Sequence, residues 1–155
     1  MNTATFPVPA ERSNLLRPIL VGGAIAGTLD LTAALLTFGS NGMRAVAAGL
    51  IGRQALQGGA LTLILGILLH YFIALSIATV YCVAGQRLGF LRDHFLVCGL
   101  FYGIGAYLVM NLIVLPLCAL HFAGPYQWRG LVQGLLVHMF FIGLPVSWSL
   151  HKFSS

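Results

Sequence analysis

Four long apolar stretches alternate with shorter or more polar segments along the chain. They cover about residues 18–38, 60–84, 95–118 and 131–150. Each is close to the roughly 20 residues that an α-helix needs to cross the hydrocarbon core of a bilayer. The pattern therefore predicts an all-α integral membrane protein, with four transmembrane helices packed in a bundle.

The polar residues before the first apolar stretch predict a short disordered tail over residues 1–16. Residues 17–155 then form a single transmembrane domain. The first apolar stretch is longer than the roughly 7–15 residues of a signal-peptide core, and no small-x-small cleavage site follows it. We therefore expect it to be retained as the first membrane helix.

The segment between the first two stretches, SNGMRAVAAGLIGRQALQGG, has a pattern of its own. Apolar Val46, Leu50 and Ile51 alternate with Arg44 and Arg53 at helical spacing. This pattern predicts a short amphipathic helix at the membrane interface, with its arginines toward the lipid head groups. A re-entrant or partly buried segment is the alternative.

The composition excludes a water-soluble domain. Hydrophobic residues make up 59% of the chain and charged residues 7%, whereas a soluble domain carries about 25% charged residues. The net charge of +5 is spread over loops one or two residues at a time, without the basic patch that nucleic-acid binding requires. The lipid bilayer is therefore the expected partner, and nucleic acid is not.

The Lys and Arg residues also predict an orientation. Five fall on one side of the four helices and three on the other. The first group is Arg12, Arg17, Arg87, Arg92 and Lys152, and the second is Arg44, Arg53 and Arg129. Because cytoplasmic loops carry the excess of positive charge, both termini are expected in the cytoplasm.

Small residues form stripes on each helix at spacings of three, four and seven residues. Small side chains let membrane helices approach closely, so the stripes predict helix–helix contacts. The glycines expected at such contacts are Gly23, Gly27, Gly66, Gly99, Gly103, Gly130 and Gly134.

Four polar side chains lie inside the apolar stretches: Asp30, His70, Asn111 and His138. Three of them fall on the glycine stripe of their own helix, and Asn111 lies roughly 80° off its stripe at 100° per residue. At 1.5 Å per residue, all four lie about 11–15 Å from the outer helix ends. We therefore expect one inward-facing polar cluster in the outer half of the membrane.

Three interpretations of this cluster remain open. It holds the helices together, as polar residues at membrane-helix contacts often do. Alternatively it serves a proton-coupled transporter or a ligand-binding membrane protein, with Asp30 and His70 as the titrating pair. A haem or metal held by His70 and His138 is the third interpretation, although no second histidine pair or CxxCH motif accompanies them.

Catalytic motifs are missing from the sequence, which has no HExxH, no phosphate loop and no recognisable Ser–His–acid spacing. We therefore expect a non-enzymatic protein without catalytic residues, cofactor or bound metal, serving as an accessory protein or subunit. A homo-oligomer or a larger membrane complex is compatible with the glycine stripes.

Pro116 and Pro145 are expected to kink the last two helices and to free the carbonyls of Leu112 and Phe141.

The stretches GTLDLTAALL, GLIGRQALQGGALTLILGILLHYFIAL, YGIGAYLVMNLIVLPL and VHMFFIGLPVSW carry a resemblance. Over about residues 20–150 the chain resembles a family of small four-helix bacterial inner-membrane proteins that has no assigned activity. The resemblance implies a location in the bacterial inner membrane and no particular chemistry. Asp30, His70, Asn111 and His138 all lie within these stretches.

Overall fold

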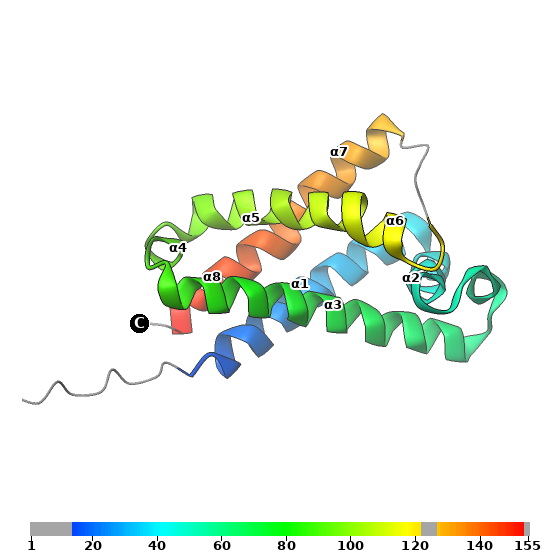
Figure 1. The fold of residues 1–155 in the computed structure, drawn as a ribbon, viewed down its shortest axis with the longest axis horizontal. Helices are drawn as coiled ribbons and strands as arrows, with labels where there is room; N and C mark the ends of the chain where they lie inside the picture. The colour runs from blue at the N-terminus through cyan, green and yellow to red at the C-terminus, as the bar shows by residue number, and fades with distance from the viewer. Residues whose placement is uncertain (1–13, 122–126, 154–155) are drawn as a thin grey trace, which may run out of the picture.

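The computed structural model describes residues 14–121 and 127–153, and these are helical nearly throughout, without a strand. Four helical segments are long and apolar enough to cross a membrane (Figure 1). The first two are α1 (Leu16–Phe38) and α3 (Ala60–Arg87). The third joins α5 (Phe95–Val109), η2 (Met110–Val114) and α6 (Leu115–Leu117); the fourth joins α7 (Trp128–Val137), η3 (His138–Gly143) and α8 (Leu144–Phe153). The predicted four-helix membrane architecture is confirmed.

The helices extend up to three residues beyond the apolar stretches. α3 continues to Arg87 and the fourth segment runs from Trp128 to Phe153, because a helix can carry polar side chains past the point where the apolar run stops. α1 begins at Leu16, so the last residue of the predicted tail is helical. The Asn14 carboxamide oxygen accepts the Leu16 N–H at 3.1 Å. The rest of that tail, residues 1–13, lies outside the described residues.

The first loop contains the predicted short helix, α2 (Ser40–Ile51), followed by a 3₁₀ turn, η1 (Arg53–Gln57). Gly39 and Gly52, with φ of 59° and 86°, end α1 and α2 in a backbone conformation that favours glycine. The buried face of α2 is formed by small residues and Met43, and the expected apolar face is exposed at Leu50 and Ile51. α2 therefore packs on the end of the bundle through its small face (Figure 1).

Arg44 differs from the expectation that the arginines of this segment point toward head groups. Its Nε donates to the Gly58 carbonyl at 2.9 Å. One of its terminal nitrogens donates to Ser40 Oγ at 2.8 Å and Asn41 Oδ1 at 3.1 Å. The side chain thus ties the two ends of the loop together, while Arg53 is exposed.

Both later segments contain a π-helical turn directly before a proline. η2 precedes Pro116, and η3 precedes Pro145. A proline lacks the N–H donor and its ring clashes with the carbonyl four residues earlier, which here belongs to Leu112 or Phe141. The wider i→i+5 turn accommodates those carbonyls. The sequence located both disturbances, and the structure resolves each as a π turn.

Glycines bring the segments together as the stripes predicted, with one exception. A Cβ at Gly23 or Gly27 would collide with α3, and one at Gly99 or Gly103 would collide with the fourth segment. Gly66 lies against the Met43 backbone, and Gly134 against the Tyr107 ring. Gly130 has no described atom within 4 Å of its Cβ position, so among the described residues no helix contact depends on it. It lies in the first turn of α7, at the exposed end of that helix.

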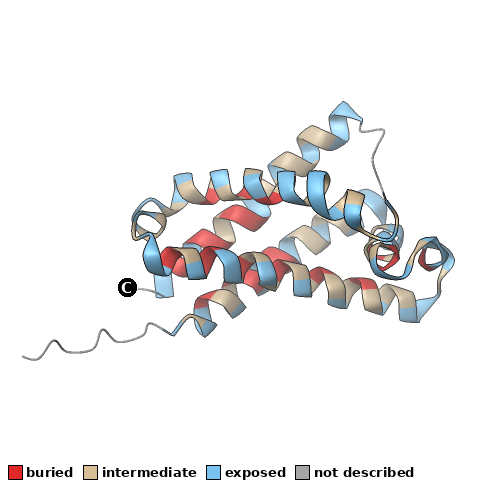
Figure 2. Cartoon of the chain, in the orientation of Figure 1, coloured by how far each residue is buried: buried red, intermediate tan, exposed pale blue. Residues whose placement is uncertain are grey.

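The buried residues line the facing sides of the segments, and the outward sides are exposed and apolar (Figure 2). Phe72 and Phe101, for example, are each 68% exposed. Large apolar side chains exposed in this number on all sides are incompatible with water and suit contact with lipid.

Candidate intramembrane polar site

Asp30 of α1 and His70 of α3 meet between the two helices. Asp30 Oδ2 lies 3.7 Å from His70 Nε2, and the two side chains are 21% and 11% exposed. His70 Nε2 also lies 3.0 Å from the Gly27 carbonyl. Because a carbonyl only accepts hydrogen bonds, Nε2 carries the proton in this bond. Both side chains therefore point toward the neighbouring helix, into the bundle.

The close approach of α1 and α3 depends on Gly27, beside which Tyr71 and Ala74 of α3 pack. Tyr71 contributes a hydroxyl that lies 2.9 Å from Thr28 Oγ1. Thr28 Oγ1 donates its own proton to the Ala24 carbonyl at 2.8 Å, so the Tyr71 O–H is the donor between them. A second polar contact therefore joins the same two helices beside Asp30 and His70.

His138 begins η3 on the fourth segment and lies within electrostatic range of both Asp30 and His70. Its Nδ1 donates to the Gly134 carbonyl at 2.9 Å, which fixes the protonated nitrogen as it does in His70. The ring packs edge-on against Tyr107, with centroids 5.3 Å apart. The His138 side chain thus contacts its own segment and Tyr107 of the third, while Asp30 and His70 contact each other between α1 and α3.

Asn111 is connected to this group through Tyr107. Its Nδ2 donates to the Tyr107 carbonyl at 2.9 Å, one turn earlier in the same segment, and the Tyr107 ring contacts His138. The absence of a side chain at Gly134 makes room for that ring. Asp30, His70 and His138 therefore form the core of the site, and Asn111 lies at its side, within the π turn η2.

Two contributors were not expected from the sequence: Tyr71 and Tyr107. The available signals were their spacings, since Tyr71 follows His70 and Tyr107 lies one turn before Asn111. The chemistry open to the Asp30–His70 contact is acid–base, because a carboxyl group and an imidazole can exchange a proton. Among residues 14–121 and 127–153, no group of three or more His, Cys, Asp or Glu side chains is arranged to hold a metal ion.

Comparison with known protein families, with curated proteins and with solved structures finds no match for this chain.

Proposed function

We propose that this chain is a small non-enzymatic integral membrane protein in which Asp30, His70 and His138 tie three membrane-spanning segments together. The contact that carries the proposal is the 3.7 Å approach of Asp30 Oδ2 to His70 Nε2. His138 lies within electrostatic range of both. The two histidines offset the cost of placing the Asp30 carboxylate inside the membrane. We propose that the bundle serves as an accessory protein or a subunit of a larger membrane assembly.

The energetics support a structural role of modest size. An aspartate at the middle of a membrane helix costs about 2.5–3.5 kcal/mol on insertion scales, and an adjacent histidine offsets part of that cost. Polar contacts between membrane helices stabilise by about 0.6 kcal/mol on average and up to about 1.7 kcal/mol. Coupling between Asp30 and His70 is expected in this range.

A double-mutant cycle tests the proposal. Asp30→Asn, His70→Gln and the double variant are compared in detergent by the free energy of unfolding. The expected coupling is about 0.6–1.7 kcal/mol. The control is a second pair of an aspartate and a histidine, Asp93 and His94, which are adjacent in sequence and exposed outside the spans. Asp93→Asn and His94→Gln are expected to couple by less than about 0.5 kcal/mol. Additive effects at Asp30 and His70 would remove the support for the structural role.

Proton-coupled transport or ligand binding is the second candidate, favoured by a groove beside the site. The groove has a volume of about 400 Å³ between α1 and the fourth segment. Its lining includes Leu29 and Val137, which precede Asp30 and His138 in sequence, together with Gln133. The Asp30 side chain is 21% exposed and the His70 side chain 11%, so Asp30 is the more accessible of the two.

Reconstituted vesicles separate the two candidates. With a pH gradient across the vesicle membrane, a proton-coupled protein acidifies or alkalises the interior faster than empty vesicles do. Asp30→Asn then abolishes this flux while the unfolding temperature in detergent stays within a few degrees of the wild type. Flux equal to that of empty vesicles for the wild-type chain would rule out proton movement through the bundle in the absence of a second substrate.

For the location, we propose the bacterial inner membrane with both termini in the cytoplasm. The five-to-three distribution of Lys and Arg supports the orientation, and the four apolar spans support a location in a membrane. The glycine faces are compatible with homo-oligomers.

A further inference from the structure

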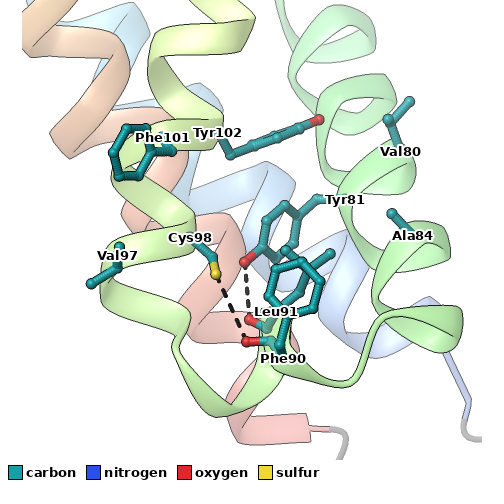
Figure 3. A pocket seen from close by; sticks show the side chains of 9 residues that line it. All are labelled: Val80, Tyr81, Ala84, Phe90, Leu91, Val97, Cys98, Phe101 and Tyr102. Atoms are coloured by element: carbon teal, nitrogen blue, oxygen red, sulfur yellow. Dashed lines mark hydrogen bonds between the residues drawn. The ribbon is translucent and has the colours of Figure 1, made fainter.

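An apolar groove lies between α3, α4 (Phe90–Asp93) and α5, at the opposite end of the bundle from α2 (Figures 1 and 3). Its volume is about 400 Å³, within the roughly 300–1,000 Å³ of small-ligand sites. The lining residues are Val80, Tyr81, Ala84, Phe90, Leu91, Val97, Cys98, Phe101 and Tyr102. Several of them, including Val80 and Phe101, are exposed, so the groove opens toward the lipid-facing surface.

The polar atoms of the lining are already hydrogen-bonded to the protein. The Tyr81 hydroxyl donates to the Leu91 carbonyl at 3.0 Å, and the Tyr102 hydroxyl donates to the Ile77 carbonyl at 2.6 Å. The Cys98 thiol lies 3.7 Å from the Phe90 carbonyl, which accepts from it (Figure 3). A ligand in the groove therefore meets ring faces and aliphatic groups, which favour a hydrocarbon chain.

The length of the groove fits one leaflet. Its deepest lining residues, Val80 and Tyr102, lie about seven residues from the near ends of α3 and α5, or about 10 Å at 1.5 Å per residue. Half of the hydrocarbon core of a bilayer is about 15 Å thick. A chain that enters beside α4 thus stays within the near leaflet.

The end of the groove at α4 is cationic. Arg87 ends α3, and Arg92 lies in α4. The Arg92 carbonyl accepts a hydrogen bond from His151 Nδ1 at 2.8 Å, which brings α8 and its Lys152 to the same end. This end therefore carries Arg87, Arg92 and Lys152, whose amine lies 4.8 Å from the Trp148 ring centre, and Asp93 is the carboxylate of α4 among the described residues. Basic pockets between membrane helices at this level favour anionic lipid head groups.

We propose that this groove binds one acyl chain of an anionic glycerophospholipid, with the lipid phosphate held at Arg87 and Arg92. The hydrocarbon chain lies over Tyr81 and Tyr102 and fills the space that α3 and α5 leave between them. The anionic head group stays at the membrane surface beside α4. The site is separate from the Asp30 group and does not depend on its role.

Quenching of tryptophan fluorescence by brominated lipid tests this binding. In a chain with Trp128→Phe and Trp148→Phe, a single tryptophan replaces either Phe101 in the groove or Phe72 outside it, both 68% exposed. The full chain is reconstituted in phosphatidylcholine vesicles in which one lipid in ten is brominated phosphatidylglycerol or brominated phosphatidylcholine. For each single-tryptophan chain, the quenching efficiency with brominated phosphatidylglycerol is divided by that with brominated phosphatidylcholine. This ratio cancels differences in the depth of the two tryptophans in the membrane.

The expected ratio is at least threefold in favour of phosphatidylglycerol at Phe101→Trp and near one at Phe72→Trp. Arg87→Gln with Arg92→Gln brings the ratio at Phe101→Trp back toward one. Ala84→Leu fills the groove and lowers quenching there by both lipids. Equal ratios at the two reporters would overturn the proposal. Weaker quenching at Phe101→Trp than at Phe72→Trp by both lipids would also overturn it, because it would mean that protein and not lipid covers the groove.

Discussion

At the scale of single residues, Gly103 and Gly105 lie two residues apart on α5 and meet different surroundings. A Cβ at Gly103 would collide with the His138 carbonyl and the Met139 backbone, whereas a Cβ at Gly105 would meet no described atom within 4 Å. The first glycine is therefore required for the contact between α5 and η3, and the second is not.

Gly103→Ala is expected to destabilise the bundle by about 1–3 kcal/mol, because the backbone of η3 must move to admit the methyl group. Gly105→Ala is expected to be neutral, or stabilising by up to about 1 kcal/mol, because alanine lowers the entropy of the unfolded chain. Thermal unfolding of both variants in the same detergent measures the difference. Equal losses for the two variants would contradict the packing described for Gly103.

The orientation of Asp30 and His70 could be predicted from the sequence, because each lies on a stripe of small residues that must face another helix. The contacts with Gly27, Thr28 and Tyr71 could not. A tyrosine in an apolar run has the same helical periodicity as a phenylalanine. Which carbonyl His70 reaches depends on the distance between α1 and α3, a tertiary quantity that no spacing along the chain encodes.

At the scale of elements, the hydropathy pattern predicted all four spans, because length and polarity decide whether a helix can cross a bilayer. It did not predict η2 and η3. Apolar residues surround both turns, so the change from i→i+4 to i→i+5 bonding leaves no mark in the pattern. Only Pro116 and Pro145 indicated a disturbance. α2 was predicted as a helix, but its packing on the bundle through Met43, Ala47 and Ala48 was not, because the pattern pointed to the larger apolar residues Leu50 and Ile51, which are exposed.

A π turn holds one residue more than an α turn, so a deletion inside it is expected to be tolerated. Removing Phe140, a 48% exposed residue of η3, converts the turn to α-helix and keeps α7 and α8 in register. Removing Phe72 from the uninterrupted α3 rotates half of that helix by about 100° and separates its two buried faces. We expect the Phe140 deletion to fold with a modestly lower unfolding temperature, and the Phe72 deletion to fail to fold. Comparable loss of folded protein in the two deletions would argue against this account of η3.

At the scale of the whole molecule, the packing is uneven. α1 contacts α3 and α8, while α5 contacts mainly η3 and α8. The groove between α3 and α5 follows from this arrangement, because neither helix closes over the other beside α4. The two polar ends of the bundle also differ: α2 and η1 cover one end, and the short α4 lies at the other, near the end of α8 (Figure 1).

The charges at these two ends predict how the bundle is oriented in the membrane. The order of the spans along the sequence assigns five Lys and Arg residues to the side of α4 and three to the side of α2. In a chain with its cysteines replaced by alanine, Asn41→Cys is expected to react with a membrane-impermeant maleimide from outside the inner membrane. Asp93→Cys is expected to react only after the membrane is permeabilised. The reverse labelling pattern would place the termini outside.

The orientation should also respond to the charges themselves. Arg87→Gln with Arg92→Gln changes the distribution from five against three to three against three. Since positive charge near the helix ends sets which loops stay in the cytoplasm, this variant is expected to insert in both orientations. Asn41→Cys and Asp93→Cys, each made singly in this background, should then both be labelled in part from outside. Replacing Arg44 and Arg53 instead raises the bias to five against one and should leave the labelling pattern unchanged. If the first variant keeps a single orientation, the charge distribution is not what orients the bundle, and the packing of α2 against the bundle becomes the feature to vary.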